Sequence, residues 1–356
     1  MYGNEFLPNW ASAPGDTIAD ILRERNLSAI EFAQQIGYTG KDVTDMLQGR
    51  ATITLAIARQ LERALGASVE FWMSRDFQYR QDITRLQAIN EEWLDELPIG
   101  DMIRFGWLKQ VPHPSEEVTA CLKFFDVPSI RAWREKYTGL FQMVAFRTSS
   151  SFDSQPGAVA TWLRQCELEA TGIECGPWNP KQFRETLSNI RSLTQFKDPH
   201  RFLPELKKRC SESGVAVVIV RAPSGCRASG ATRFLSPDKA LLLLSFRYLS
   251  DDQFWFTFFH EAGHLILHNA SDLFLEGTDM LSNVQEEDAN RFAADILVPA
   301  ELKEAFINLR ADYRQVIRFA LRVGIAPGVV VGQMQHYGRI GQNQLNRLKR
   351  RYKWED

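Results

Sequence analysis

Two histidines four residues apart are the side chains of this sequence best suited to share a metal ion. His260 and His264 belong to a His-Glu-x-x-His pattern inside the apolar run 258–265. One helical turn separates them, so both imidazoles leave the same face of a helix. Glu261 is placed to reach a water on that ion without being a ligand. A divalent metal lowers the pKa of such a water to roughly 7 and a glutamate accepts its proton, which is the chemistry of zinc-dependent peptidases.

A helix has to hold these side chains, and the surrounding sequence predicts one. Ser250 and Gln253 resemble a capping box at its start, and Asp251 and Asp252 place negative charge in its first turn. Apolar residues then recur at helical spacing, at Phe254, Phe258, Ala262, Leu265 and Ile266. The alternative is a core helix that carries histidines by coincidence, but burying a His-Glu pair without partners costs free energy.

A catalytic zinc needs a third protein ligand. His268 is excluded by geometry, because eight helical residues rise about 12 Å and His260 and His268 cannot both reach one ion. Glu286 opens a second expected helix, and Asn290 shares its face four residues later. Glu286 is therefore the candidate ligand, and Asn290 is a candidate to orient a ligating histidine. The alternative is an acidic first turn that only favours the helix dipole.

The two helical motifs, with the segments 230–234 and 241–245 before them, resemble the ImmA/IrrE family of bacterial and phage metallopeptidases over roughly residues 200–300. The resemblance implies a zincin-like fold of the gluzincin type with a small sheet. The family's roles fall on His260, His264 and Glu286 as zinc ligands and on Glu261 as the general base. It also implies limited proteolysis of a DNA-binding repressor. Zn²⁺ is the expected cofactor, and Mn²⁺ stays open because a His-His-Glu site does not by itself select between them.

The N-terminal part predicts four short helices, over residues 16–25, 28–37, 41–48 and 54–65. The second carries a Ser28 cap, Glu31 at the third position and a closing Gly37, and a tight turn leads to the third. Two short helices across such a turn are typical of a helix-turn-helix. The segment resembles HigA-type (XRE-type) antitoxins and related phage-repressor-like domains. That resemblance implies that the DNA major groove would be faced by Thr39, Gly40, Lys41, Asp42, Thr44 and Asp45.

Charge leaves the role of this N-terminal part open. Acidic residues outnumber basic ones over residues 1–80, whereas phosphate contacts need positive charge. A module that docks onto a protein is therefore the alternative to one that binds a DNA operator.

Length and composition indicate several domains. The chain has 356 residues, 44% of them hydrophobic, and a net charge of -2, which is typical of a globular protein larger than one ordinary domain. Nothing in it predicts a bilayer span or a signal peptide, so we expect a cytoplasmic protein without membrane contact. Its five cysteines are widely spread and form no Cys-x-x-Cys pair, which indicates free thiols in a reducing compartment.

We expect an α+β, predominantly helical fold in three parts. Residues 1–80 would form the helix-turn-helix bundle, residues 81–200 a helical connector that joins, dimerises or senses, and residues 201–356 the zincin-like metallopeptidase domain with a C-terminal helical extension. Strands are expected at 215–220 and 241–245, the latter being either a sheet edge that receives an extended peptide or a core strand.

The C-terminal extension carries two further candidates. An apolar run after Pro327 predicts a helix that packs back on the domain, and its His336 is a candidate oxyanion donor, although a lone histidine is more often structural. The basic segment 346–353 is either a solvated helix face or a contact with nucleic acid.

The sequence thus predicts a transcriptional regulator or antitoxin-like protein with zinc-dependent endopeptidase activity. Its substrate would be a regulatory protein, either a helix-turn-helix repressor or a toxin partner, and its further partner a DNA operator. A homodimer stays open. The alternative is a non-enzymatic DNA-binding regulator or antitoxin whose peptidase-like domain acts as a sensor or docking module.

Overall fold

The computed structural model describes residues 8, 10–145, 154–268, 274–275 and 283–354. The chain is predominantly helical with one small sheet, which confirms the expected α+β class. It divides into two compact units, Met1–Asp95 and Glu96–Asp356. The first is called unit 1 and the second unit 2.

Unit 1 is a bundle of five helices: α1 (Pro14–Glu24), α2 (Ala29–Ile36), α3 (Gly40–Leu47), α4 (Leu55–Leu65) and α5 (Val69–Asp95). The first four agree with the predicted helices to within two residues. α2 begins with the expected capping box, since Glu31 N donates to Ser28 Oγ and Ser28 N donates to the Glu31 carboxylate. Gly37 ends it in the left-handed region, at φ 71°. Thr39 then caps α3.

The core of unit 1 joins the first four helices to the start of α5. Buried apolar side chains such as Ile18, Phe32, Val43 and Leu61 meet around fully buried Trp72. The Trp72 indole donates from Nε1 to the carbonyl oxygen of Gly66 at 3.0 Å, so its polar atom is satisfied inside the core.

Unit 2 contains eleven further α-helices, two short 3-10 helices and four strands among its described residues. Its helices are α6 (Ile99–Arg104), α7 (Pro114–Phe125), α8 (Ile130–Ala145), α9 (Pro156–Thr171), α10 (Pro180–Ile190), η1 (Arg191–Gln195), α11 (Pro199–Ser211), α12 (Asp251–Leu267), α13 (Asn283–Leu297), α14 (Ala300–Ile307), α15 (Tyr313–Val323), α16 (Pro327–His336) and η2 (Asn346–Leu348). Five of them start with a proline in the first turn, where its fixed φ and missing N–H cost nothing.

The sheet has the strand order β1-β3-β2-β4, with β1 (Val215–Ile219), β2 (Gly230–Ser236), β3 (Lys239–Leu244) and β4 (Phe274–Leu275). β1 runs parallel to β3, and β2 runs antiparallel to both β3 and β4. The strand just before the histidine helix is therefore central. Of the two roles considered for it, the core strand is correct and the peptide-accepting edge is wrong.

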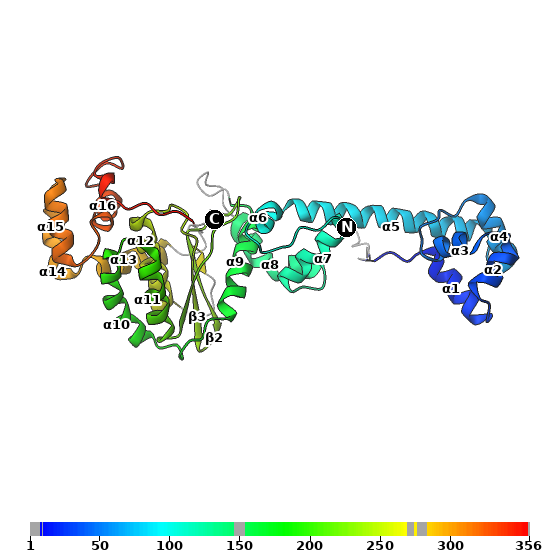
Figure 1. Cartoon of the computed structure of the whole chain (residues 1–356), viewed down its shortest axis with the longest axis horizontal. Helices are drawn as coiled ribbons and strands as arrows, with labels where there is room; N and C mark the ends of the chain where they lie inside the picture. The colour runs from blue at the N-terminus through cyan, green and yellow to red at the C-terminus, as the bar shows by residue number, and fades with distance from the viewer. Residues whose placement is uncertain (1–7, 9, 146–153, 269–273, 276–282, 355–356) are drawn as a thin grey trace. The chain divides into compact units, whose positions relative to one another are not determined.

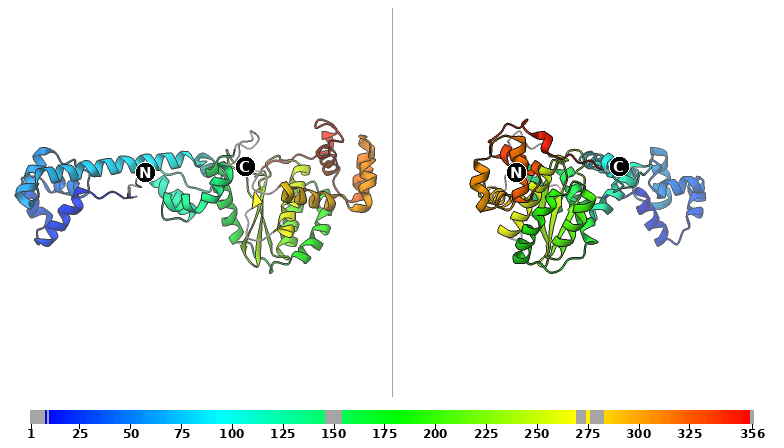
Figure 2. Two further views of the ribbon diagram at one scale, coloured as in Figure 1. Left: turned by 180° about the vertical axis from the view of Figure 1, so that it is seen from behind. Right: turned by 60° about the vertical axis from the view of Figure 1, so that its left-hand side comes forward.

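Helices cover both faces of this sheet, with α9 on one side and α11 and α12 on the other (Figures 1 and 2). β1 and β3 are accordingly almost continuously buried, and their sequences are unbroken apolar runs. From α9, Trp162 Nε1 donates to the carbonyl oxygen of Val220 at 3.0 Å. The layers hold α12 rigidly against β2 and β3.

The start of α12 is fastened by the C-terminal segment. The Ser250 hydroxyl donates to Asp252 Oδ1 at 2.7 Å and makes no cap, so the expected capping box is wrong. Asp251 and Asp252 are buried; Lys349 forms an ion pair with Asp252 at 2.6 Å, and Arg350 N donates to Asp251 Oδ1 at 3.0 Å. The Lys349 ammonium and the main chain of Arg350 thus hold the start of α12, whereas a contact of the segment 346–353 with nucleic acid stays a prediction.

The expected three-part division stays a prediction. Residue 80 lies within α5, which runs without a break from Val69 to Asp95, and residue 200 lies within α11. The expected helix after Pro327 is confirmed as α16, which packs on α12. In the described ranges no single helix combines the length and apolar character of a membrane span; α15 and α16 do so only together, with a bend of 107° between them.

Candidate metal centre

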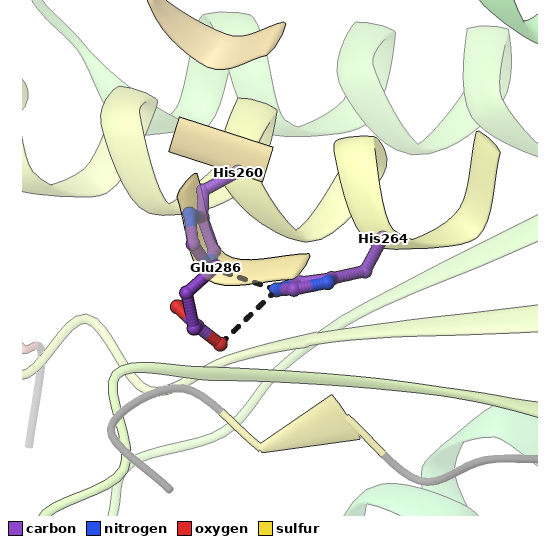
Figure 3. Close-up of side chains that lie close together, drawn as sticks. All are labelled: His260, His264 and Glu286. Carbon is purple, nitrogen blue, oxygen red and sulfur yellow. Dashed lines mark hydrogen bonds and ion pairs between the residues drawn. The ribbon is translucent and has the colours of Figure 1, made fainter. Parts of the chain in front are cut away.

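α12 places its two histidines in the buried interior of unit 2. His260 is 2% exposed and His264 is 1% exposed, and Phe258, Phe259 and Leu265 pack the neighbouring faces of the helix into the core. The two Nε2 atoms lie 3.0 Å apart, so both rings point to one place (Figure 3). This is the arrangement that the four-residue spacing predicts.

Glu286, from the first turn of α13, completes the group. Its Oε2 lies 3.3 Å from His260 Nε2, and its Oε1 lies 3.5 Å from His264 Nε2 (Figure 3). A tetrahedral zinc with ligand bonds of about 2.0–2.1 Å would space its ligand atoms about 3.3–3.4 Å apart. Two imidazoles and one carboxylate at these separations fit a zinc ion, and three protein ligands leave the fourth position open, as catalysis requires.

Close packing of α12 on α13 lets Glu286 reach the histidines. At Gly263 a Cβ atom would lie 3.1 Å from Phe292 Cδ1 and 3.2 Å from Ala289 Cα, so the two helices approach nearly to backbone contact there. Glycine at the second x of the His-Glu-x-x-His pattern thus sets the helix separation, which in turn brings Glu286 into range.

The other ring nitrogen of each histidine has a hydrogen-bond partner. His260 Nδ1 lies 3.0 Å from Asn290 Oδ1. An amide oxygen only accepts, so this Nδ1 carries the hydrogen and Nε2 keeps its lone pair for a metal. His264 Nδ1 lies 3.0 Å from Nδ1 of His268, which ends α12. The contact of Asn290 with His260 is the one that the sequence predicts. The contact of His268 with His264 was not predicted, although the spacing of four residues between them indicates it.

The electrostatics favour the protonation states that bind metals. Burial lowers the pKa of His264, so its ring is neutral at pH 7. Burial acts to raise the pKa of Glu286, but the interactions with the neighbouring His260 and His264 rings outweigh it and hold that pKa at about 2. Neutral imidazoles beside an ionised carboxylate are the forms that coordinate a divalent cation.

Glu261 is fully buried and lies against β2. A Cβ atom at Gly230 would lie 2.6 Å from Glu261 Oε1 and 2.7 Å from both Glu261 Cγ and Thr257 Cγ2. The first residue of β2 is therefore in direct contact with the candidate base, and only glycine leaves room for the carboxylate. Sequence reasoning identified the segment 230–234 by resemblance but missed this contact, which depends on the packing of β2 across α12.

His336 lies outside the group of three. It is exposed at the end of α16, and its ring centroid is 5.5 Å from that of Phe256, which is in turn 6.2 Å from that of His260. The ring of Phe256 thus contacts both histidine rings, and the oxyanion role of His336 stays a prediction. The cysteines form no disulfide among themselves: Cys121, Cys166, Cys210 and Cys226 are buried, and Cys175 is half-buried.

The residues expected to face DNA lie at the start of α3 in unit 1. Thr39, Gly40, Lys41 and Thr44 are exposed. The Asp42 carboxylate accepts hydrogen bonds from Thr39 Oγ1 and Thr39 N, which lower the pKa of Asp42. The Asp45 carboxylate pairs with Arg50 at 2.5 Å. Both acidic side chains are therefore engaged in local contacts, and the charge of Asp45 is paired with that of Arg50.

Residues 212–331 match the family model of the M78 peptidases, described as the IrrE N-terminal-like domain. The match spans β1 to α16 and includes every residue of the candidate metal centre. At the level of the family it supports a metallopeptidase-type domain. Among solved structures, an antidote protein of a plasmid maintenance system from Nostoc punctiforme, so described, is similar at 28% identity over 24% of this chain and 92% of its own, with a TM-score of 0.22. No curated protein sequence matches the chain.

Proposed function

We propose that this protein is a zinc-dependent endopeptidase that cleaves a regulatory protein. The observation that carries the proposal is the convergence of His260 Nε2, His264 Nε2 and the Glu286 carboxylate within 4.8 Å of one another, inside a region that matches an M78 peptidase model. His260, His264 and Glu286 would hold the ion. Zinc bound there supplies Lewis acidity and lowers the pKa of water to about 7.

The chain's own residues have distinct tasks in this proposal. Glu261 accepts the proton from the attacking water and donates it to the leaving amine as the peptide bond breaks. Asn290 fixes the tautomer and the orientation of the His260 ring, and His268 holds the orientation of the His264 ring. Gly230 keeps β2 close while leaving Glu261 its place. The covered sheet and the aromatic core make these positions rigid, which catalysis by positioned groups requires.

The test separates metal binding from catalysis. Purified wild type should contain about one zinc per chain, whereas His264→Ala and Glu286→Ala should lose it, because two ligands rarely retain a zinc ion. Glu261→Gln should keep the zinc and lose proteolysis by roughly 100-fold or more, as expected for a missing acid–base group. A wild type that takes up no zinc would instead favour a non-enzymatic sensor or docking module.

For unit 1 we propose a helix-turn-helix formed by α2 and α3 that binds a DNA operator through Thr39, Gly40, Lys41, Asp42, Thr44 and Asp45. The exposure of the first turn of α3 and the ion pair of Asp45 with Arg50 support it. The protein would then join operator binding to proteolysis of a repressor or toxin partner. Selection of genomic DNA fragments by wild type and by a Lys41→Ala/Thr44→Ala variant tests this. Enrichment of the same sequence by both proteins would contradict it and favour protein docking.

A further inference from the structure

A cavity lies on the side of α13 away from the sheet, where α14 and α16 gather (Figure 1). Its volume is about 320 Å³, which is within the range of pockets that hold small ligands or side chains. The apolar part of its wall comes from Ala294 of α13, from Val298 just after that helix, and from Phe306 and Ile307 of α14. Ile307 stands at the rim with 62% of its surface exposed, so the cavity opens to solvent beside an apolar side chain.

Two features connect this cavity to the metal centre. Glu286, Asn290 and Ala294 are four residues apart and form one row along α13, with a rise of about 12 Å from the first to the third. Glu286 is the candidate metal ligand, Asn290 contacts His260, and Ala294 belongs to the cavity wall.

A series of ring contacts also joins the metal centre to the cavity. Centroid distances are 6.2 Å from His260 to Phe256, 5.5 Å from Phe256 to His336, 5.2 Å from His336 to Tyr337, and 6.3 Å from Tyr337 to Phe306. Phe306 and Tyr337 line the cavity. His336 and Tyr337 are exposed, so the middle of this series of rings lies at the surface between the metal centre and the cavity.

One buried polar group in the wall has no partner among the described residues. The Gln333 side chain is 3% exposed and makes no hydrogen bond to any residue within those ranges. The two cationic wall residues are engaged: Lys303 pairs with Asp295 at 2.5 Å, and Arg339 donates to the Phe306 and Leu309 carbonyl oxygens. Buried amides are normally satisfied, so the Gln333 amide is available to a molecule that enters the cavity.

From these observations we infer that the cavity is a substrate subsite, an inference that rests on the proposed peptidase function. It receives an apolar side chain of the substrate polypeptide, of the size of leucine or phenylalanine, and the Gln333 amide bonds the adjacent main chain. An extended chain advances about 3.3 Å per residue, so the 12 Å row places this side chain roughly three to four residues from the bond that is cleaved.

The experiment measures binding and cleavage separately. An array of randomised decapeptides is exposed to the zinc-loaded full chain carrying Glu261→Gln, alone and with Ile307→Glu added at the rim. Leu321→Glu on α15 is the matched control, because Leu321 is equally apolar, 69% exposed and outside the cavity wall. Bound peptides should share an apolar residue at one position. Ile307→Glu should weaken their binding at least tenfold or shift that position to lysine and arginine, and Leu321→Glu should change neither.

Gln333→Leu tests whether the amide serves binding or folding. Since the amide makes no hydrogen bond to the described residues, leucine there should leave the melting temperature unchanged or higher, while peptide binding should fall at least fivefold. A lower melting temperature with unchanged binding would mean a structural role and would contradict the inference.

The outcomes separate this subsite from the peptidase proposal. Failure to bind any peptide, or an unchanged motif and affinity in Ile307→Glu, overturns the subsite, even where zinc-loaded wild type cleaves peptides. Binding with the expected apolar position and the expected Ile307→Glu effect supports it. If wild type then leaves those bound peptides intact, the peptidase proposal fails and the cavity remains a peptide-binding site.

Discussion

Replacing Gly230 by alanine should disable the candidate base without disturbing the metal ligands. Gly230 does not adopt a positive φ, so its backbone accepts alanine and only the added Cβ matters. That atom would lie 2.6 Å from Glu261 Oε1, whereas ordinary contacts begin at 3.4 Å, and the Thr257 methyl group at 2.7 Å closes the other side. The Glu261 carboxylate or β2 therefore has to move by about 0.8 Å, and a misplacement of about 1 Å in a catalytic group costs on the order of 100-fold.

We expect kcat/KM on a cleaved peptide to fall by up to about 100-fold in Gly230→Ala, which corresponds to about 2.7 kcal/mol. Zinc content should stay at the wild-type level, because the atoms nearest to the added Cβ belong to Glu261 and Thr257 and not to the three candidate ligands. The matched control is Gly139→Ala in α8, where an added Cβ meets nothing within 4 Å. Alanine in that helix should leave activity unchanged and should stabilise the fold by up to about 1 kcal/mol.

Two results would refute this reasoning. Wild-type activity in Gly230→Ala would show that the contact with Glu261 does not govern catalysis. Loss of zinc in parallel with activity would show that the added methyl group acts on the ligands and not on the base. Peptide cleavage, zinc content and melting temperature are therefore measured on the same preparations of both variants.

Three further predictions concern the surroundings of α12. Asn290→Ala removes the acceptor for His260 Nδ1, and zinc titration should show roughly 10–100-fold weaker binding; an unchanged affinity would contradict the orienting role. Burial raises the pKa of Asp251 from 3.8 to about 6. The folded state therefore binds this proton more tightly than the unfolded chain, and the free energy of unfolding should fall by up to about 3 kcal/mol as pH rises from about 4 to about 6. Urea titrations should show that slope in wild type and a flatter one in Asp251→Asn. Lys349→Met leaves Asp252 buried without its cation and should cost about 3–5 kcal/mol, whereas adding Asp252→Asn should recover part of that loss; additive effects of the two changes would argue against the pair.

Much of the local structure could be predicted because it depends on neighbours in the sequence. The capping box of Ser28 and Glu31 and the left-handed Gly37 set both ends of α2 within ten residues. The same is true of the histidine face of α12, since a four-residue spacing places His260 and His264 together on any helix. The prediction of Glu286 as the third ligand required two further observations. One was the helical spacing that places Glu286 and Asn290 on one face, and the other was the resemblance to a known family.

The capping box expected at Ser250 shows the limit of such local rules. Its hydroxyl donates to Asp252 because Lys349 and Arg350, a hundred residues further along the chain, hold the acidic first turn of α12 in the core. A local rule assumes that a helix end meets water. Burial of this end by a distant segment replaced the cap with an ion pair.

The sequence by itself determined which side chains are candidates for the chemistry and on which helices they stand, because helix spacing and caps act over a few residues. Only the tertiary structure decided that β3 is central in the sheet, that Gly230 contacts Glu261 and that Gly263 sets the approach of α13. Those features depend on how β2 and α13 pack on α12. Packing distances of a few tenths of an ångström depend on side chains that are far apart in sequence, and no local pattern records them.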